Sequence, residues 1–372
     1  MKFCVLSSLT ARSGSSIRNR GVCRALAGLG HSVTYLEPLA PGEEAALAEG
    51  FSHEPVPVRS ARPLFWMLPA ALANLARLRE LKPAAVLVMK PFPHTAVPAL
   101  LARRNCGAKV VVDFDDLDSG YAAGALARRL LEWMQLFFIR RADLVCVHNG
   151  ALREYLSSRG VAPEKISWLG QGIEPEKYAA RPGAGPALPP GWESATVLVY
   201  AAHLGPAAAL EPLFEIVAGL AGNFRLLVIG GGAQLEEFKA LARRLGAEGR
   251  THFTGYLSHP ETIAWLRLGQ IALNYLYEEQ PRDRFRSQIK IREYLALGLP
   301  VVSSRGGDIE LFREFVEIAG DKTDFAGRIM KLAADLPSAA ARAARGRVWV
   351  TEKYSWPGLV REWLAGSGLD KL

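Results

Sequence analysis

A cluster of basic side chains lies immediately before a short predicted helix near residue 290. Arg282, Arg284 and Arg286 lie in a polar loop, and Lys290 follows in the first turn of a helix indicated by apolar residues at helical spacing over 289–297. Because the helix macrodipole disfavours a cation in the first turn, these charges repel one another unless an anion lies beside them. Backbone N–H groups at a helix N-terminus, together with basic side chains, suit a phosphate or diphosphate.

A carboxylate shares the expected face of this helix. Glu293 lies three residues after Lys290, so both side chains should project on the same side. A carboxylate one turn from a phosphate site can accept hydrogen bonds from a ribose diol. Alternatively, the basic loop is only solvated and the two residues form an ordinary ion pair. The charge pattern alone leaves both interpretations open.

The ends of the helix are marked by residues with strong terminal preferences. Ser287 is a suitable N-cap, Gly298 can adopt the left-handed conformation that ends a helix, and Pro300 prevents the helix from continuing. The apolar run 300–304 then predicts a short buried strand. The segment is therefore expected to be a basic loop, a helix and a strand of an α/β domain.

The composition is that of a folded protein with a basic surface. With 372 residues, of which 49% are hydrophobic, the chain is long enough for two domains that each bury a core. The net charge of +8 favours an acidic partner, such as nucleotide phosphates or an anionic membrane surface. Nucleic acid is not expected as a partner, because the sequence has no nucleic-acid motif and no basic stripe interleaved with aromatic residues.

The cysteines and the first residues favour a cytoplasmic location. The 4 cysteines, at positions 4, 23, 106 and 146, include no CxxC pair, which favours reduced thiols over a disulfide or a zinc site. Residues 1–8 form too short an apolar run for a signal peptide and instead predict a strand. No run of about 18 apolar residues occurs, so no transmembrane helix is expected.

Strand and helix signals alternate through both halves of the chain, which predicts two α/β domains with parallel sheets. The strands are expected at 3–6, 32–36, 85–89, 109–114, 143–147 and 165–169, and then at 196–201, 224–229, 251–254, 271–275 and 300–304. Residues 181–194, rich in proline and glycine, are expected to link the domains. Ala-rich helices are expected from 307 to about 350, followed by a final helix from Tyr354.

Polar residues follow two of the strands in the first half. The strand predicted at 85–89 is followed by His94, and the strand predicted at 109–114 runs into Asp115 and Asp116. Loops at the carboxyl ends of parallel strands carry function in sheets of this kind. The two aspartates could therefore act in a reaction, or they could simply cap the next helix.

Three glycines follow the strand predicted at 224–229. Gly230, Gly231 and Gly232 fit a backbone that must approach a ligand closely. The third glycine of the dinucleotide fingerprint would be Leu235, so the segment is weak evidence for NAD. No dinucleotide cofactor is therefore predicted.

The segment around Lys290 carries more information than its charge. The run Ser287-Gln-Ile-Lys290-Ile-Arg-Glu293-Tyr294-Leu-Ala-Leu-Gly298-Leu-Pro300-Val-Val resembles the donor-site signature of retaining glycosyltransferases with the GT-B fold, in particular family 4, the glycosyl transferases of group 1. In that family the pattern is roughly Ser-Pro-x-Lys-x-x-Glu-Tyr-x-Ala-x-Gly-x-Pro-Val-Val. The resemblance extends over nearly the whole chain and is most specific over 225–302.

The resemblance implies the GT-B fold, in which two doubly wound Rossmann-like domains face a cleft. It implies an acceptor-side domain at 1–180 and a domain that binds the nucleotide-sugar donor at 195–353. The final helix, 354–372, is expected to return to the first domain. Its apolar residues at helical spacing have little left to cover elsewhere.

The family's motifs also imply which residues act. The residues expected to bind the donor are His203, Gly205, Gly230, Gly231, Tyr256, Asp283, Arg284, Arg286, Lys290 and Glu293. The expected catalytic residues are Asp115 and Asp116, and the residues expected at the cleft or the acceptor are Ser13, Gly14 and His94. Asp115 occupies the place where many members have a histidine, and Tyr256 lies in a loop expected against the nucleotide base.

Two departures fall at positions that contact the donor in the family. Phe285 occupies the position, eight residues before Glu293, where many members have a first glutamate, and Asp283 is a possible substitute. His203 lies where members usually have an arginine that binds the donor diphosphate, and no lysine follows it closely. The diphosphate would then be bound mainly by Lys290 and the loop arginines.

The resemblance implies transfer of a sugar from a UDP- or GDP-linked donor to a hydroxyl of a glycan or lipid-linked acceptor, with retention, in surface polysaccharide or glycoconjugate synthesis. Fixed cations and a helix dipole would stabilise the leaving diphosphate, so no metal or other cofactor is expected. A GT-B sugar-nucleotide epimerase is one alternative, although no obvious set of acid/base groups supports it. A non-catalytic sugar-nucleotide-binding subunit is the other, motivated by Phe285 and His203.

Two segments combine apolar and basic residues and could contact the inner face of a membrane. The segment 59–82 contains the apolar run 65–68 between cations, and the segment 126–141 has a similar composition. Either could instead be a helix that packs on the core with solvated ends. This second interpretation suits 126–141 better, so any peripheral contact with anionic lipid is expected through 59–82.

Overall fold

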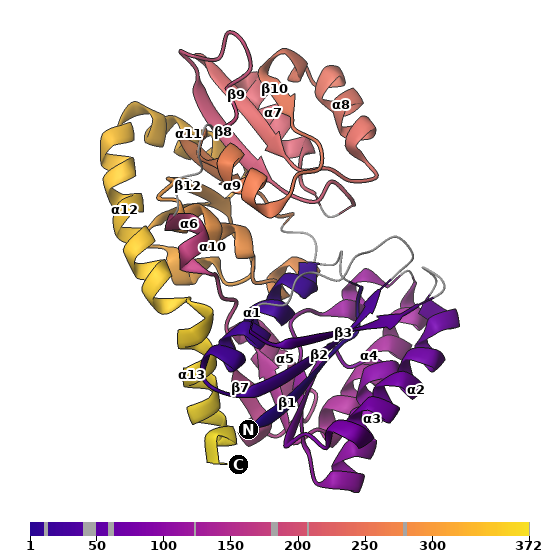
Figure 1. Cartoon of the computed structure of the whole chain (residues 1–372). Coiled ribbons are helices and arrows are strands. Elements are labelled where there is room, and N and C mark those ends of the chain that lie inside the picture. The colour runs from indigo at the N-terminus through magenta and orange to yellow at the C-terminus, as the bar shows by residue number, and fades with distance from the viewer. Residues whose placement is uncertain are drawn as a thin grey trace. The chain divides into compact units, whose positions relative to one another are not determined.

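The computed structural model describes residues 1–10, 14–39, 50–58, 63–122, 124–179, 185–206, 208–277 and 281–371, with only the backbone of 14, 63–65, 281–282 and 371. Its contacts divide the chain into two compact units, each built around one parallel sheet (Figure 1). Unit 1 comprises Met1–Gly172, Phe285–Ser287 and Tyr354–Leu372, and unit 2 comprises Ile173–Arg284 and Gln288–Lys353. The fold is therefore the predicted pair of parallel-sheet α/β domains.

The described sheet of unit 1 has seven parallel strands in the order β3-β2-β1-β4-β5-β6-β7. They are β1 (Lys2–Ser7), β2 (Ser32–Leu39), β3 (Ser52–Pro57), β4 (Ala85–Met89), β5 (Lys109–Asp113), β6 (Leu144–Val147) and β7 (Ile166–Trp168). The chain runs from β1 to one edge and then returns to β4 on the other side, so the sheet is doubly wound. In such sheets ligands bind beyond the carboxyl ends of the strands.

Helices cover both faces of this sheet (Figure 1). The helices on one face are α1 (Gly14–Gly28) and α13 (Trp356–Ser367). The helices that pack on the other face are α2 (Pro63–Leu81), α3 (Pro93–Cys106), α4 (Ala125–Arg141) and α5 (Gly150–Ser158). Unit 1 also contains the short helices η1 (Asp118–Tyr121), η2 (Pro163–Lys165) and η6 (Leu369–Lys371).

The described sheet of unit 2 has six parallel strands in the order β10-β9-β8-β11-β12-β13. They are β8 (Thr196–Ala201), β9 (Phe224–Ile229), β10 (Thr251–Phe253), β11 (Ile271–Asn274), β12 (Val301–Ser304) and β13 (Val316–Ala319). The helices are α6 (Pro175–Ala179), α7 (Glu211–Gly219), α8 (Leu235–Arg244), α9 (His259–Leu266), α10 (Ile289–Ala296), α11 (Lys322–Ala334) and α12 (Leu336–Lys353), with η3 (Glu248–Arg250), η4 (Pro281–Phe285) and η5 (Ile309–Phe312). Across the ranges described in both units, no helix is long and apolar enough to cross a bilayer.

The sequence does not predict two of the edge strands. β3 contains Pro55 and Pro57, which an edge strand tolerates because one side of its backbone has no partner strand. β13 lies inside the region where only Ala-rich helices are expected, so that expectation is wrong at 316–319. Its four residues are too few to show a period against the helices on either side.

Helix α10 ends as the sequence predicts but begins one residue later. Gly298 has a φ of +74° and its N–H donates to the Leu295 carbonyl at 2.8 Å, which confirms the left-handed C-terminal cap. The N-cap residue is Gln288 rather than Ser287, and it makes no side-chain cap hydrogen bond. The first turn that contains Lys290 therefore receives no cap from the side chain of Gln288.

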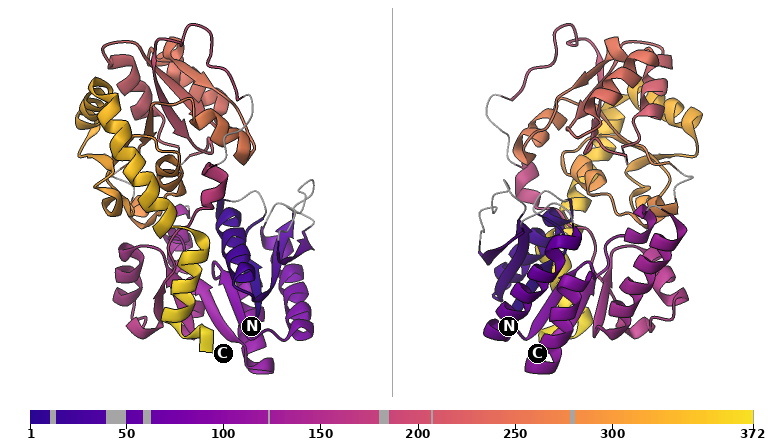
Figure 2. Two further views of the ribbon diagram at one scale, coloured as in Figure 1. Left: turned by 60° about the vertical axis from the view of Figure 1, so that its left-hand side comes forward. Right: turned by 90° about the vertical axis from the view of Figure 1, so that its right-hand side faces the viewer.

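The final helix packs on unit 1, which confirms the prediction made from its apolar face (Figure 2). Trp356 is buried in the same core cluster as residues of α1. A Cβ atom at Gly21 would lie 2.2 Å from Nε1 of Trp356, and one at Gly172 would lie 2.5 Å from the same indole ring. Glycine at both positions is therefore what lets the indole approach the backbone so closely.

Substitution of Gly21 by alanine should destabilise the protein, because the new methyl group collides with the buried Trp356 indole. Overpacking of this kind costs about 1–3 kcal/mol. Gly28→Ala in the same helix is the matched control, since a Cβ there meets nothing within 4 Å and should leave stability unchanged or slightly higher. Urea unfolding followed by circular dichroism measures both, and equal midpoints for the two variants would contradict the packing argument.

Candidate active site

In unit 2, the N-terminus of α10 is fixed against the end of strand β8. The backbone N–H of Ala201 donates to the hydroxyl of Tyr294 at 2.9 Å, and Tyr294 is fully buried. One turn earlier, Nζ of Lys290 lies 4.3 Å from the ring centroid of Tyr200, a cation–π distance. The predicted phosphate-binding lysine is thus held next to the loop that carries His203, whose side chain is exposed.

The glycines after β9 allow three loops of unit 2 to touch. A Cβ at Gly230 would lie 2.0 Å from the carbonyl oxygen of Ala202, and one at Gly232 would lie 2.3 Å from that of Leu204. A Cβ at Gly231 would lie 2.6 Å from the backbone nitrogen of Tyr256. The glycines are thus required by contacts between backbones, a reason that the sequence analysis did not consider. The loops so assembled present Tyr256, whose side chain is 84% exposed.

Gly205 lies in the first of these loops and is buried. A Cβ there would lie 3.4 Å from the ring of His203, so the loop is tightly folded under that histidine. The Leu204 N–H donates to the Gly231 carbonyl at 3.0 Å, which joins the loop to the glycine segment. The two predicted donor loops are therefore one hydrogen-bonded structure.

The carboxylate of Glu293 has two donors within unit 2. The hydroxyl of Tyr178 donates to Oε1 at 2.8 Å, and Nε2 of His259 lies 3.0 Å from the same oxygen. The Glu293 side chain is 12% exposed. Burial and the Glu293 charge raise the pKa of Tyr178 well above its ordinary value, so its hydroxyl stays protonated and donates. Sequence reasoning missed both partners, which lie far from Glu293 in the chain and belong to no recognised motif.

The basic loop before α10 is divided between the two units. Asp283 is buried and Arg284 is exposed, and both belong to unit 2. Phe285 and Arg286 belong to unit 1. There the Phe285 carbonyl accepts from Nδ2 of Asn149 at 2.7 Å, and its ring lies in the core cluster. The aromatic residue at the family's glutamate position is therefore a core residue of unit 1, which the signature alone could not indicate.

In unit 1, a buried ion pair ties α1 to the carboxyl end of β5. Arg18 contacts Asp113 through two hydrogen bonds, Nε to Oδ2 at 2.7 Å and Nη2 to Oδ1 at 2.9 Å. The same guanidinium donates to the carbonyl oxygens of Leu169 and Gly170 at 2.9 and 2.8 Å. With a fifth bond from Nη1 to Oε1 of Gln171 at 3.4 Å, each of the five donors meets an acceptor, as a buried arginine requires.

The strand-end aspartates surround a buried lysine. Nζ of Lys90 lies 2.6 Å from Oδ1 of Asp118 and 3.2 Å from Oδ1 of Asp115. The hydroxyl of Ser15 donates to the other oxygen of Asp115 at 3.3 Å. Burial opposes ionisation of Asp115, but the charges of Lys90 and Arg18, with smaller contributions from His148 and the Lys90 hydrogen bond, together lower the pKa of this carboxyl. Lys90 and Asp118 could have been found by the strand-end rule that identified Asp115.

Asp116 differs from its neighbour in both contacts and titration. Its Oδ2 accepts from the hydroxyl of Tyr121 at 3.0 Å, and its Oδ1 accepts from the backbone N–H of Leu117 at 2.9 Å. Burial raises the pKa of Asp116 from 3.8 to about 6, and the charges of Asp115 and Asp118 add to that rise. A carboxyl that titrates near neutral pH can exchange a proton in a reaction.

The structure describes two of the three residues expected at the cleft or the acceptor. Ser13 lies outside the described residues, and Gly14 is the first residue of α1. His94 is buried in unit 1, with its ring centroid 4.8 Å from that of Trp66. Burial lowers the pKa of His94 to about 4, so the imidazole is neutral near pH 7. His94 therefore packs against Trp66, and its role at the cleft or the acceptor stays a prediction.

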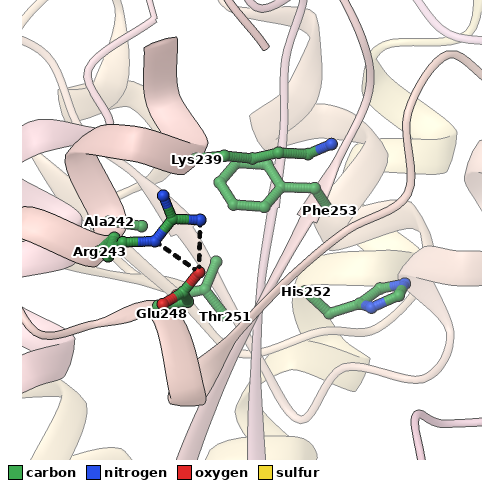
Figure 3. A pocket seen from close by; sticks show the side chains of 7 residues that line it. All are labelled: Lys239, Ala242, Arg243, Glu248, Thr251, His252 and Phe253. Carbon is green, nitrogen blue, oxygen red and sulfur yellow. Dashed lines mark hydrogen bonds and ion pairs between the residues drawn. The ribbon is translucent and has the colours of Figure 1, made fainter. Parts of the chain in front are cut away.

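Among the described residues, neither a metal-binding group nor the pocket shown in Figure 3 coincides with these residues. The described chain contains no group of three or more His, Cys, Asp or Glu side chains that could hold a metal ion. Figure 3 shows a pocket of about 270 Å³ in unit 2, where Arg243 and Glu248 form an ion pair at 2.9 Å. Its lining residues are Lys239, Ala242, Arg243, Glu248, Thr251, His252 and Phe253. None of them is a predicted site residue.

Comparison with protein families agrees with this arrangement. The model described as "Glycosyl transferase 4-like domain" matches residues 13–172, and the model described as "Glycosyl transferases group 1" matches residues 195–335. The chain belongs to the group 1 glycosyltransferases. The two matches divide this glycosyltransferase as its sheets do, with all strands of the first sheet except β1 inside one match and the whole second sheet inside the other.

Individual proteins similar to this glycosyltransferase include a sequence relative and solved structures of the same fold. It is 25% identical over 349 residues to a GDP-mannose-dependent alpha-(1-6)-phosphatidylinositol monomannoside mannosyltransferase of Mycobacterium tuberculosis, covering 88% of this chain and 87% of that one. Its fold is similar to that of HepE from Anabaena, solved with UDP and glucose, at a TM-score of 0.78 and 14% identity with full coverage of both chains. Sucrose-phosphate synthase from Thermosynechococcus elongatus has a TM-score of 0.79 and 16% identity, covering 100% and 99%. These similarities establish the GT-B fold.

Asp116→Asn should make the glycosyltransferase more stable at neutral pH. Because the folded pKa of about 6 lies above the ordinary 3.8, the folded state binds the proton more tightly, and stability falls as pH rises between these values. Removing the carboxyl should therefore add about 1–3 kcal/mol above pH 6 and nothing below about pH 4. Urea unfolding at both pH values measures the difference. An equal gain in the free energy of unfolding at both pH values would show that folding does not raise the pKa of Asp116.

Proposed function

We propose that the protein transfers a sugar from a UDP- or GDP-linked donor to a hydroxyl of a lipid-linked or glycan acceptor, with retention of configuration. The observation that carries this proposal is the fixed N-terminus of α10, where Lys290 and Glu293 of the signature lie beside the end of β8. Support for the nucleotide comes from relatives that use GDP-mannose or were solved with UDP. Synthesis of a surface polysaccharide or glycoconjugate would be the setting.

Unit 2 would bind the donor. Its diphosphate would meet the first turn of α10, with Lys290 and the exposed Arg284 supplying positive charge. The ribose would bind at Glu293, and the exposed ring of Tyr256 offers a surface for the base. Cations fixed before the reaction stabilise the leaving diphosphate without reorganisation, which is the main task of the protein in this chemistry.

Unit 1 would serve the acceptor through its strand-end carboxylates. Asp115 is engaged by Lys90 and Ser15, whereas Asp116 has a raised pKa of about 6. Asp116 is therefore the better of the two predicted catalytic residues to exchange a proton with an acceptor hydroxyl. Asp115 would instead hold Lys90 in place.

Two alternative functions are a non-catalytic sugar-nucleotide-binding subunit and a sugar-nucleotide epimerase. A non-catalytic sugar-nucleotide-binding subunit is favoured by His203 and Phe285, where the family usually has charged donor ligands. A GT-B epimerase has one structural parallel, a putative UDP-N-acetylglucosamine 2-epimerase from Listeria monocytogenes with a TM-score of 0.64 and 12% identity, covering 100% and 98%. Release of nucleoside diphosphate only when acceptor is present identifies the transferase. Binding without turnover identifies the binding subunit.

Lys290→Ala should weaken nucleoside diphosphate binding roughly ten- to a hundredfold and nucleoside binding little, because charge-assisted hydrogen bonds of this kind are worth about 1.5–3 kcal/mol. Glu293→Gln should weaken both ligands alike, since its partner is the ribose. Lys239→Ala, a surface lysine of the same unit, is the control. Calorimetric titration of UDP, GDP, uridine and guanosine measures all three. Normal diphosphate binding by a less stable Lys290→Ala variant would make the lysine structural.

The net charge of the protein resides entirely in unit 1. This unit contains 24 lysines and arginines against 16 aspartates and glutamates, a net +8, whereas unit 2 contains 21 of each. An anionic surface would therefore attract unit 1 and not unit 2. This asymmetry supports a location at the inner face of an anionic membrane.

Exposed apolar side chains of unit 1 gather on the helices of one sheet face. Leu126, Leu130 and Trp133 of α4 are 81%, 63% and 63% exposed and recur at helical spacing, beside the exposed Arg128 and Arg129. Exposed apolar residues of the neighbouring helices α2 and α3 are Leu68, Leu72 and Val97. All six lie in the first two thirds of their helices, and those helices begin at the carboxyl edge of the sheet. We propose that this surface binds anionic lipid peripherally.

This assignment keeps Leu68 and Leu72 of the segment expected in the sequence and adds the first half of α4. Residues 59–62 lie outside the described part, and Trp66, which motivated the choice of 59–82, is only 6% exposed and packs in the core. Helix α4, which the sequence favours as a core helix, buries its second half and exposes its first. Composition alone could not separate these two outcomes, because both segments contain apolar residues on more than one face.

Reversal of charge at Arg128 and Arg129 should weaken binding to phosphatidylglycerol vesicles at least roughly thirtyfold, since each basic residue near such a surface contributes about 1 kcal/mol. The matched control reverses the exposed Arg345 and Arg347 of unit 2, with the same change in net charge. Trp133→Ser should also reduce binding, and salt should weaken it further. Vesicle flotation measures these effects. Equal losses of vesicle binding in the two double variants would show that binding depends on net charge alone and not on this surface.

A further inference from the structure

The two donors to Glu293 share one of its oxygens. Both the Tyr178 hydroxyl and Nε2 of His259 contact Oε1, at 2.8 and 3.0 Å. An ionised carboxylate offers about four lone-pair sites, two on each oxygen. The Oε1 sites are thus occupied, while Oε2 has no partner among the described residues. Oε2 can therefore accept two hydrogen bonds, and a ribose cis-diol has two hydroxyl groups to donate them.

Both donors are held in place by contacts of their own. Tyr178 lies on α6, which packs on α10, and its carbonyl oxygen accepts from Nη2 of Arg267 at 2.6 Å. His259 is the first residue of α9, and Ser258 before it forms a capping box with Glu261. Tyr178 and His259 therefore belong to fixed elements. They orient the Glu293 carboxylate, and the carboxylate does not orient them.

Burial makes the Tyr178 contact costly to lose. The Tyr178 side chain is almost fully buried, and if Glu293 turned away its hydroxyl would be left with the more distant Nε2 of His259, at 3.4 Å. The glutamate side chain has three rotatable bonds. Two hydrogen bonds to Oε1 restrict their rotation, so Oε2 points in one direction. The entropy of fixing the carboxylate is then lost on folding and not on ligand binding.

We propose that Tyr178 and His259 are positioning residues that hold Oε1 of Glu293 and so present Oε2 to the ribose diol, which makes the site selective for ribonucleotides over 2′-deoxyribonucleotides. This inference rests on the proposed donor site in unit 2. It adds a reason for selectivity at the sugar of the nucleotide, and it assigns that selectivity to residues outside the donor signature.

The test compares affinities for GDP and UDP with those for their 2′-deoxy forms. The wild-type protein should prefer the ribonucleotides, and Tyr178→Phe should reduce that preference roughly three- to tenfold, because losing one hydrogen bond frees Oε1 and lets the carboxylate turn. Tyr155→Phe is the matched control, since it removes a similar tyrosine bond to a glutamate, 2.7 Å long, in unit 1. Its preference should equal that of the wild type.

Two further variants distinguish positioning from a merely structural role. His259→Ala should lower the preference as Tyr178→Phe does, and His259→Gln, which keeps a donor, should restore part of it. His259 is also the safer test if Tyr178→Phe does not fold, because its side chain is 34% exposed. In a Glu293→Gln background, neither Tyr178→Phe nor His259→Ala should alter the preference for ribonucleotides further, because the carboxylate that both residues orient is no longer present.

The outcomes separate the inference from the proposed function. If the wild type binds ribonucleotides and Tyr178→Phe weakens ribo and deoxy forms equally, Tyr178 only supports the fold and the inference is overturned. Equal affinity of the wild type for both forms overturns it as well. If the wild type binds no nucleotide in thermal-shift and calorimetric measurements, the proposed function itself fails.

Discussion

The hydrogen bond between the Ala201 N–H and the Tyr294 hydroxyl joins the end of β8 to α10, and the candidate site of unit 2 depends on it. It sets the position of the first turn of α10 and therefore of Lys290. The loop that follows β8 touches the three glycines after β9, which in turn touch Tyr256. A side chain at any of these glycines would push the loops apart, so the site is built by backbone contacts before any ligand is present.

The two units differ in net charge and in where their charged residues lie. In unit 1 the buried cations Arg18 and Lys90 each have aspartate partners, so the interior is compensated and the excess positive charge is carried by the surface. Asp116 is the exception, because burial and neighbouring carboxylates raise its pKa. Unit 2 has no net charge, and its positive residues near α10 are concentrated where an anionic ligand would bind. The overall basicity of the chain therefore does not arise from its donor site.

The sequence predicts the central strands closely, since runs such as 196–201 and 224–229 are continuous apolar segments between turn residues. It fails at one edge of each sheet, at β3, which contains proline, and at β13, which has four residues between helices. In the site, the local signature predicts that Lys290 lies in the first turn of α10, but the bonds of Glu293 to Tyr178 and His259 join residues that are 115 and 34 positions apart. Such contacts follow from packing and leave no period or spacing in the sequence.

The departure at Phe285 is a change of structural role rather than the loss of one ligand. Its ring lies 5.7 Å from that of Tyr155 in the core of unit 1, and Asn149 binds its carbonyl oxygen. An ionised glutamate in that apolar setting would be costly, so the position cannot supply a carboxylate to a donor sugar with the present packing. Asp283, two residues earlier, is buried in unit 2 and is the nearest acidic group in the sequence. Any contact with the donor sugar from this segment must therefore differ from that of relatives with a glutamate here.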